Sequence, residues 1–158
     1  MTDLPTRRYP AHVPPVARVY RSTILFVTAC VQRRRGILAN DDVHNLVRTK
    51  WAQADHWLVG RYMIMPDHVH FFCAPGAVER EIKGWMSYWR NQVTREWPEP
   101  TQKPIWQSDF WDTQMRNLEH YAAKWEYVRQ NPVRAGLVAE TDDWSYQGEL
   151  NLLQWIGP

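Results

Sequence analysis

Two strand-like segments separated by only two residues constrain the fold of this chain more than any other feature. Residues 56–65, HWLVGRYMIM, and residues 68–74, HVHFFCA, are both rich in β-branched and aromatic residues. A Pro-Asp pair lies between them, and a Pro-Gly pair ends the second segment. Because consecutive strands joined by a short connection usually pair with each other, the sequence predicts an antiparallel hairpin here.

Other segments extend this hairpin into a sheet covered by helices. Residues 19–31 are rich in β-branched and aromatic residues and are predicted as a strand, and residues 105–115 as a strand or hairpin. Residues 41–54 and 79–97 carry apolar residues at helical spacing. A last helix is expected from an Asn117 cap through Gln130, where the following proline stops it. The order β-α-β-β-α-β-α predicts an α+β domain with a ferredoxin-like antiparallel sheet and helices packed on it.

The 158 residues suit one domain with short extensions at both ends. We expect a Pro-rich basic arm over residues 1–18, the domain over residues 19–140, and a tail over residues 141–158 that packs on the domain. No apolar run reaches the roughly 18 residues of a membrane span, and the first residues lack the apolar region of a signal peptide. We therefore expect a cytoplasmic protein with no membrane partner, whose Cys30 and Cys73 are reduced thiols.

Positive charge is concentrated at the amino-terminal end. Residues 1–35 carry seven arginines and one acid, a net charge of +6, whereas the rest of the chain sums to −4. The seven are Arg7, Arg8, Arg18, Arg21, Arg33, Arg34 and Arg35. This asymmetry is typical of an edge that binds a polyanion, and equally of a solvated arm that aids solubility.

His68 and His70 lie two residues apart in the second hairpin strand, so their side chains share one face. Two imidazoles at this spacing can bind one divalent metal ion. The alternative is a pair of histidines that are merely hydrogen-bonded or half-exposed. The remaining histidines are not grouped, so a third metal ligand has to come from elsewhere in the fold.

The last helix offers candidates for a nucleophile and a third ligand. At 100° per residue, one arc of this helix forms the expected core face, which comprises Leu118, Tyr121, Ala122, Trp125 and Val128. Tyr127 lies nearly opposite this arc, and Asn131 follows one turn later on the same side. This pattern fits a displayed nucleophile beside a metal ligand. It also fits an exposed tyrosine followed by an asparagine that ends the helix.

Taken together, several motifs resemble the HUH single-tyrosine transposases, and more narrowly the REP-associated tyrosine transposases. The motifs are LFVTACVQRR, MPDHVHFF, IKGWMSYWRNQ, IWQSDFWDTQMR and YVRQNPVRAGLV. The resemblance covers roughly residues 18–140. The histidine motif and the tyrosine motif, in this order and at this separation, are far more specific together than either is alone.

The resemblance implies a role for each matching residue. The two family histidines fall on His68 and His70, the nucleophilic tyrosine on Tyr127 and the third metal ligand on Asn131. Two positions depart from the family pattern. Asp67 stands where asparagine is common, and Asn131 stands where transposing relatives use the longer glutamine.

The resemblance also implies a reaction. Tyr127 would attack a phosphodiester of single-stranded DNA and form a 5′-phosphotyrosine link, with Mg²⁺ or Mn²⁺ on the ligand set. The expected substrates are DNA hairpins such as repetitive extragenic palindromes, which would make the protein nucleoid-associated. The arginines of the basic end, together with Lys83 and Arg90, are the expected phosphate contacts. A monomer is favoured over a dimer.

Two other functions remain open at this point. A metal-dependent phosphodiesterase would use the histidine pair to activate water and would not need the tyrosine. A non-catalytic module would bind hairpin nucleic acid without a metal ion and without forming a covalent adduct.

Overall fold

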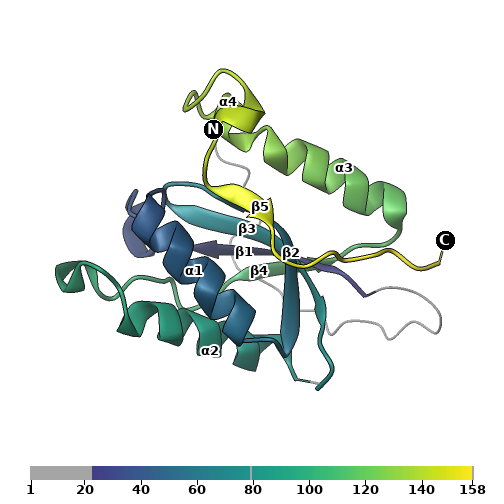
Figure 1. The fold of residues 1–158 in the computed structure, drawn as a ribbon, viewed down its shortest axis with the longest axis horizontal. Helices are drawn as coiled ribbons and strands as arrows, with labels where there is room; N and C mark the ends of the chain where they lie inside the picture. Colours follow the sequence, from purple (N-terminus) through teal and green to yellow (C-terminus); the bar gives the residue numbers. More distant parts are fainter. Residues whose placement is uncertain (1–22, 79, 158) are drawn as a thin grey trace.

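The computed structural model describes residues 23–78 and 80–157. Five strands form one antiparallel sheet in the order β4-β1-β3-β2-β5 (Figure 1). The strands are β1 (Leu25–Cys30), β2 (Trp57–Ile64), β3 (His68–Pro75), β4 (Trp111–Gln114) and β5 (Gln147–Glu149). The helices are α1 (Asp41–Gln53), α2 (Ile82–Arg95), α3 (Leu118–Arg129) and α4 (Asn131–Arg134), with short 3-10 turns η1 (Gln32–Arg34), η2 (Pro100–Gln102) and η3 (Thr141–Asp143). The predicted α+β class and the β2-β3 hairpin are confirmed.

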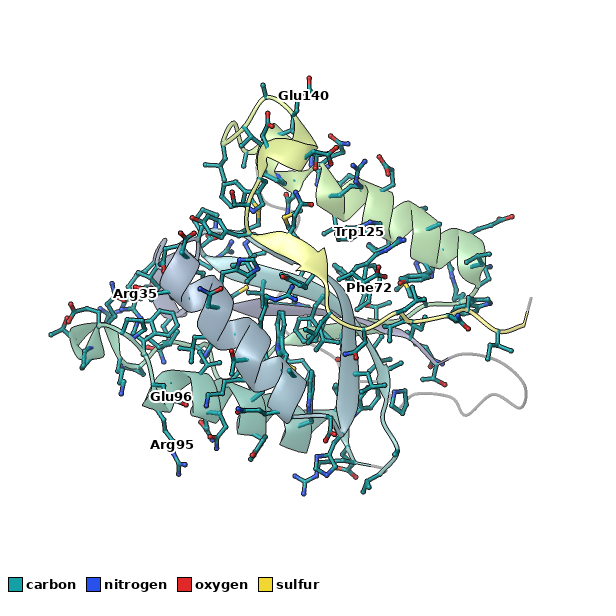
Figure 2. All side chains as sticks on the ribbon, viewed as in Figure 1. Arg35, Phe72, Arg95, Glu96, Trp125 and Glu140 are labelled. Carbon is teal, nitrogen blue, oxygen red and sulfur yellow. The ribbon has the colours of Figure 1, made fainter. Side chains whose placement is uncertain are left out.

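Helices cover both faces of the sheet (Figure 1). α1 and α2 pack on one face, where alternate residues of β3, namely Val69, Phe71 and Cys73, enter the larger core cluster. α3 packs on the other face, where Phe72 of β3 contacts Tyr121 and Trp125. Figure 2 shows the side chains of Phe72 and Trp125 between the sheet and this helix. Because side chains alternate along a strand, His68 and His70 face α3 together with Phe72.

Aromatic rings in edge-to-face and tilted contact form much of the larger core. Trp89 of α2 lies at its centre, fully buried, with ring centroids 5.3 to 6.2 Å from those of four other aromatic side chains. These four are Trp51, Phe71, Trp85 and Trp106. The tryptophans at helical spacing are therefore core residues, as the apolar stripe of residues 79–97 predicts.

The carboxyl-terminal part differs from the prediction in three ways. The last helix ends at Arg129, and Pro132 lies in the first turn of the short helix α4 instead of stopping all helical structure. Proline is well tolerated there because the first helical amides have no partner within the helix. The tail also adds the edge strand β5, which pairs with β2. Its sequence QGE has no apolar alternation that would have predicted a strand.

The buried face of α3 is narrower than predicted. Tyr121 and Val128 are buried, whereas Leu118 is 54% exposed and Ala122 is also exposed. At 100° per residue Leu118 and Ala122 lie at one edge of the predicted arc. The helix packs through the other edge of that arc, so the assignment of these two residues to the core was wrong.

The tail packs on the sheet as expected. The indole Nε1 of Trp144 donates to the carbonyl of Ile64 at 3.0 Å, and Leu153 lies against Gly60 of β2. Trp155 packs against the smaller core cluster, which lies between the sheet and α3 and includes Phe72 and Tyr121. The boundaries of the arm, domain and tail remain predictions, and most of the arm lies outside the described residues.

Among the residues that the structure describes, no helix is long and apolar enough to cross a membrane.

Candidate active site

The histidine pair lies in the middle of the sheet. β3 has β1 on one side and β2 on the other, and His68 and His70 are both completely buried. Their ring centroids are 4.6 Å apart, with the ring planes near perpendicular. In both rings Nε2 is buried and has no hydrogen-bond partner among the residues that the structure describes. Two buried imidazole nitrogens on one face, both unsatisfied, are unusual because buried polar groups are normally paired.

The other nitrogen of each ring is bonded. His68 Nδ1 lies 2.7 Å from Oδ1 of Asp67, and His70 Nδ1 lies 2.8 Å from the hydroxyl of Thr28, its neighbour across the β1-β3 ladder. Phe26 of β1 stacks on the His70 ring with the centroids 5.1 Å apart. The contacts at Nδ1 and on the ring faces therefore fix both rings with Nε2 as the free atom.

Burial and nearby cations keep His70 neutral. Burial lowers the pKa of His70 well below its ordinary value, because the charged ring would lose its hydration. The charged groups that lower this pKa further are, in decreasing order, His68, Lys124, Arg134 and Arg34. A neutral imidazole keeps a lone pair for a metal ion at neutral pH.

The histidine pair suits the divalent metal ion that the family resemblance implies, because both free nitrogens are the atoms through which imidazole binds metals. Among the described residues, no group of three histidine, cysteine, aspartate or glutamate side chains is suited to a metal ion. Within that part of the chain a third protein ligand therefore has to be a different kind of side chain, and Asn131 is the predicted one.

Asn131 opens α4 and is completely buried. Its Oδ1 accepts a hydrogen bond from Arg134 at 3.4 Å, and its Nδ2 has no partner. An amide oxygen has two lone pairs, so Oδ1 retains one for a metal ion. The prediction that Asn131 lies on the exposed side with Tyr127 was wrong, because α3 ends at Arg129 and the chain turns into α4 between them.

Tyr127 is displayed on α3 as predicted, with 48% of its surface exposed. The guanidinium of Arg134 lies over its ring, with Cζ 3.8 Å from the ring centroid. Arg134 also donates to the Tyr127 carbonyl at 2.8 Å and so spans the break between α3 and α4. One arginine therefore contacts both the tyrosine and the buried asparagine.

A salt bridge between Asp67 and Arg34 adjoins His68. Asp67 accepts from His68 through Oδ1, and its Oδ2 lies 2.8 Å from Arg34 Nη2. Burial raises the pKa of Asp67, but the hydrogen bond and charge of His68 and the charge of Arg34 outweigh this effect, so the pKa falls below its ordinary value. Asp67 is therefore a carboxylate at neutral pH.

The predicted DNA-binding residues are scattered. Arg7, Arg8, Arg18 and Arg21 lie outside the described residues. Arg33 and Lys83 are exposed, but Lys83 lies on α2, across the sheet from the histidine pair. Arg35 donates to the carbonyls of Gln32, Gln102 and Pro104, which ties it to the loop at η2.

Arg90 is the clearest departure among these basic residues. An expected phosphate contact should be exposed, but Arg90 is only 7% exposed. Its guanidinium donates to the carbonyls of Met86, Gln107 and Ser108 and lies over the ring of Phe110. These contacts hold the loop before β4 to the helix, so the exposed position predicted for Arg90 was wrong.

Two cations near the histidine pair were missed by the sequence reasoning. Lys124 lies on the sheet-facing side of α3, with Nζ 5.3 Å from the ring centroid of Phe26. Arg134 lies in α4, three residues after Asn131. At 100° per residue Lys124 lies about 40° beyond Val128, at the edge of the buried face of α3, and a lysine there was an available signal because lysine is seldom buried unless it is paired.

Comparisons with known proteins bear on the fold and on the family resemblance. No family model matches the chain. Two curated relatives, from Haemophilus influenzae and Escherichia coli K12, are both described as REP-associated tyrosine transposases and are 28% identical to this chain. The matches span 94 residues (52% of this chain and 53% of that protein) and 88 residues (56% and 52%), respectively. The chain thus spans about half the length of the curated relatives it matches.

Solved structures show the same fold. A REP-associated tyrosine transposase bound to a REP hairpin superposes with a TM-score of 0.68 at 22% identity, over 85% of this chain and 82% of that one. A Deinococcus radiodurans protein described as a transposase superposes with a TM-score of 0.51 at 15% identity, over 76% and 98%. The fold is that of the HUH transposases. Within that class, the resemblance of this chain to the REP-associated tyrosine transposases is confirmed.

Proposed function

We propose that this protein is a metal-dependent endonuclease and strand transferase that cleaves and rejoins single-stranded DNA at hairpins through a 5′-phosphotyrosine on Tyr127. One observation carries the proposal. The rings of His68 and His70, each with a free Nε2, lie with their centroids 4.6 Å apart on the sheet face that is covered by α3, the helix that bears Tyr127.

The chemistry follows from the side chains present. The Tyr127 oxygen attacks the scissile phosphorus and gives up its proton to water, and a new O–P bond forms. The bond to the 3′ oxygen breaks, and that oxygen takes up a proton from water to leave a 3′ hydroxyl. Tyrosine is a weak nucleophile at neutral pH, with an ordinary pKa of about 10, so the phosphate needs activation. Mg²⁺ or Mn²⁺ held by His68, His70 and Asn131 would supply it by polarising a non-bridging oxygen. The covalent link retains the phosphodiester energy, so a 3′ hydroxyl can later reseal the strand.

Positive charge around the site supports a phosphate-bearing substrate. Lys124, Arg134 and Arg34 lie close enough to His70 to lower its pKa. We propose that the first two contact the phosphates beside the scissile bond, and that Arg33 and the basic amino-terminal arm contact phosphates further away. The hairpin bound to the structural relative is a REP hairpin, and we propose a hairpin of that kind as the substrate here.

Two finer points belong to the same proposal. We propose that the protein acts as a monomer, which light scattering of the free protein and of its hairpin complex tests directly. We also propose that it associates with the nucleoid through DNA binding. A salt dependence of hairpin affinity would follow from its phosphate contacts.

The decisive experiment uses a hairpin oligonucleotide from the protein's own genome, labelled at the 5′ or the 3′ end, with Mn²⁺ and denaturing gels. We expect a protein-linked band that carries only the 3′ label. Tyr127→Phe and His68→Ala should both abolish it. Tyr88→Phe is the matched control and should retain it, because Tyr88 is similarly exposed (45%) but lies on α2.

Two other outcomes would each indicate a different function. Cleavage without a covalent band, unchanged in Tyr127→Phe, would indicate a metal-dependent phosphodiesterase. Specific binding of hairpins with no cleavage in any metal ion would indicate a non-catalytic binding module.

A further inference from the structure

The two histidines of the candidate metal site are supported by different kinds of partner. His70 Nδ1 lies against the neutral hydroxyl of Thr28, which can donate or accept and does not itself choose the tautomer. His68 Nδ1 lies against the carboxylate of Asp67, which can only accept. The proton of a neutral His68 is therefore held on Nδ1, and the lone pair is left on the free Nε2.

Asp67 is itself held on its other oxygen. Oδ2 lies 2.8 Å from Arg34 Nη2, so one carboxylate bridges the imidazole and the guanidinium. The side chains of Arg34 and Asp67 are 31% and 20% exposed, whereas His68 is fully buried. The pair therefore extends from partly exposed surface to the buried ring.

Backbone hydrogen bonds fix the positions of Arg34 and Asp67 relative to each other. The loop after β1 holds the β2-β3 turn by two hydrogen bonds, from the amide of Val31 to the carbonyl of Asp67 at 3.0 Å and from the amide of Leu38 to the carbonyl of Pro66 at 2.9 Å. Val31 and Leu38 are fully buried. The loop that carries Arg34 is thus anchored to the turn that carries Asp67, on both sides of the arginine.

Backbone strain in the same loop indicates that the loop has a functional role. Arg33 and Arg34 have φ values of 58° and 54°, in the left-handed region that residues with a side chain rarely adopt. Two consecutive residues of this kind persist only where the surroundings determine them, and such strain gathers at functional sites. Here the conformation delivers Arg34 to Asp67.

We propose that Asp67 and Arg34 form a positioning pair, which holds His68 in its Nδ1–H tautomer and thereby presents Nε2 to a divalent cation. This inference rests on the proposed metal site at His68 and His70. It assigns a role to the position where this chain departs from the family's common asparagine. The negative charge of Asp67 makes His68 a stronger ligand than an amide partner would.

The first test needs no metal ion. Nitrogen-15 NMR of the histidine rings in the free protein reports which nitrogen of His68 carries the proton. We expect the Nδ1–H tautomer in the wild type and a mixture of tautomers in Asp67→Ala. Asp67→Asn should keep the tautomer, because its amide oxygen still accepts from Nδ1–H. An unchanged tautomer in Asp67→Ala would overturn the inference.

The second test is Mn²⁺ affinity by calorimetry at fixed pH. We expect Asp67→Ala to weaken binding by about 10- to 100-fold, as for other carboxylate partners of metal-bound histidines. Asp67→Asn and Arg34→Gln should weaken it less, because each removes one charge of the pair but leaves an acceptor for His68. Asp142→Asn is the matched control and should bind Mn²⁺ as the wild type does, since that exposed carboxylate pairs with Arg129 at the end of α3.

The outcomes separate this inference from the proposed function. If His68→Ala and His70→Ala abolish Mn²⁺ binding but the Asp67 and Arg34 variants bind normally, the positioning role is refuted and the metal site stands. If the two histidine variants bind Mn²⁺ like the wild type, the metal site itself is refuted. Thermal melting of each variant shows whether it is folded, and Asp67→Asn replaces Asp67→Ala if the latter does not fold.

Discussion

The guanidinium of Arg134 lies over the ring of Tyr127, with Cζ 3.8 Å from the ring centroid. The same side chain donates to the carbonyl of Tyr127 and to Oδ1 of Asn131. It therefore joins the proposed nucleophile to the proposed metal ligand across the break between α3 and α4. A cation this close to a phenol ring can hold the ring in place.

Replacing Arg134 by glutamine should slow formation of the covalent DNA adduct by about 10- to 100-fold, which corresponds to about 1.4 to 2.7 kcal/mol of activation free energy. The reason is the loss of both the contact with the ring and the charge near the phosphate. Single-turnover kinetics on a labelled hairpin measure the rate. Arg129→Gln is the matched control, since Arg129 ends α3, the helix that bears Tyr127, but pairs with Glu126 and Asp142. Equal rates for the two variants would contradict a role for Arg134.

Asn131 is expected to tolerate aspartate better than alanine. Its Nδ2 is buried and has no acceptor among the described residues, so replacing this nitrogen by the second carboxylate oxygen of aspartate loses no hydrogen bond. Arg134 lies beside the side chain and would balance the negative charge of the carboxylate. A carboxylate is also a stronger ligand than an amide for Mg²⁺ and Mn²⁺. We expect Asn131→Asp to bind Mn²⁺ at least as tightly as the wild type and Asn131→Ala to bind it at least about tenfold more weakly, by calorimetry. Weak binding by both variants would exclude Asn131 as a ligand.

Much of the fold was predictable because its signals are local. The apolar stripe of α2, the helix α1 and the short link between β2 and β3 are all found where the sequence indicates. The placement of His68 and His70 on one face also follows from strand alternation alone. These features depend on periodicity and on short-range geometry, which a single sequence carries.

The rest of the site depends on long-range contacts. Arg35 and Arg90 donate to the carbonyls of residues far away in the sequence, and Arg34 pairs with Asp67. These contacts depend on which loops lie next to each other in the folded protein. A sequence shows only that an arginine is present and off the apolar stripe. The burial of Asn131 likewise follows from the turn into α4, which a proline one residue later did not predict.

The aromatic core should dominate stability. Trp89 is fully buried among four other aromatic rings, so its removal leaves a large cavity that the surrounding rings cannot fill. We expect Trp89→Ala to lower the free energy of unfolding by about 3 to 5 kcal/mol in denaturant titrations. Tyr88→Ala, next to it on α2 but exposed, should cost about 0.5 kcal/mol or less. Similar losses for the two variants would argue against this packing.

Acid should destabilise the protein in part through His44. Its Nε2 lies 2.7 Å from the hydroxyl of Tyr62, and burial, followed by the charge of Arg48, lowers its pKa below 6.5. The unfolded chain therefore takes up this proton at a higher pH than the folded chain does. The stabilisation is present above the unfolded pKa of about 6.5 and is lost as the pH falls below it.

His44→Gln is the variant that tests this pH dependence. Glutamine can still bond to Tyr62 but cannot titrate, so the free energy of unfolding should fall less steeply between pH 7 and pH 5 than in the wild type. Denaturant titrations across this range measure the difference. Identical slopes would show that the pKa of His44 is the same in the folded and unfolded states.

The docking of the tail depends on Gly60. A Cβ at this position of β2 would lie 2.6 Å from Cδ1 and 2.7 Å from Cγ of Leu153, closer than atoms can approach. Gly60→Ala should therefore lower the free energy of unfolding by about 1 to 3 kcal/mol through overpacking. Leu153→Ala should cost about 2 to 3 kcal/mol by removing a buried side chain. In the double variant the shortened side chain leaves room for the new methyl group, so the combined loss should be smaller than the sum by at least about 0.5 kcal/mol. A double-mutant cycle in denaturant measures this coupling, and strictly additive losses would mean that the tail does not lie against Gly60 in solution.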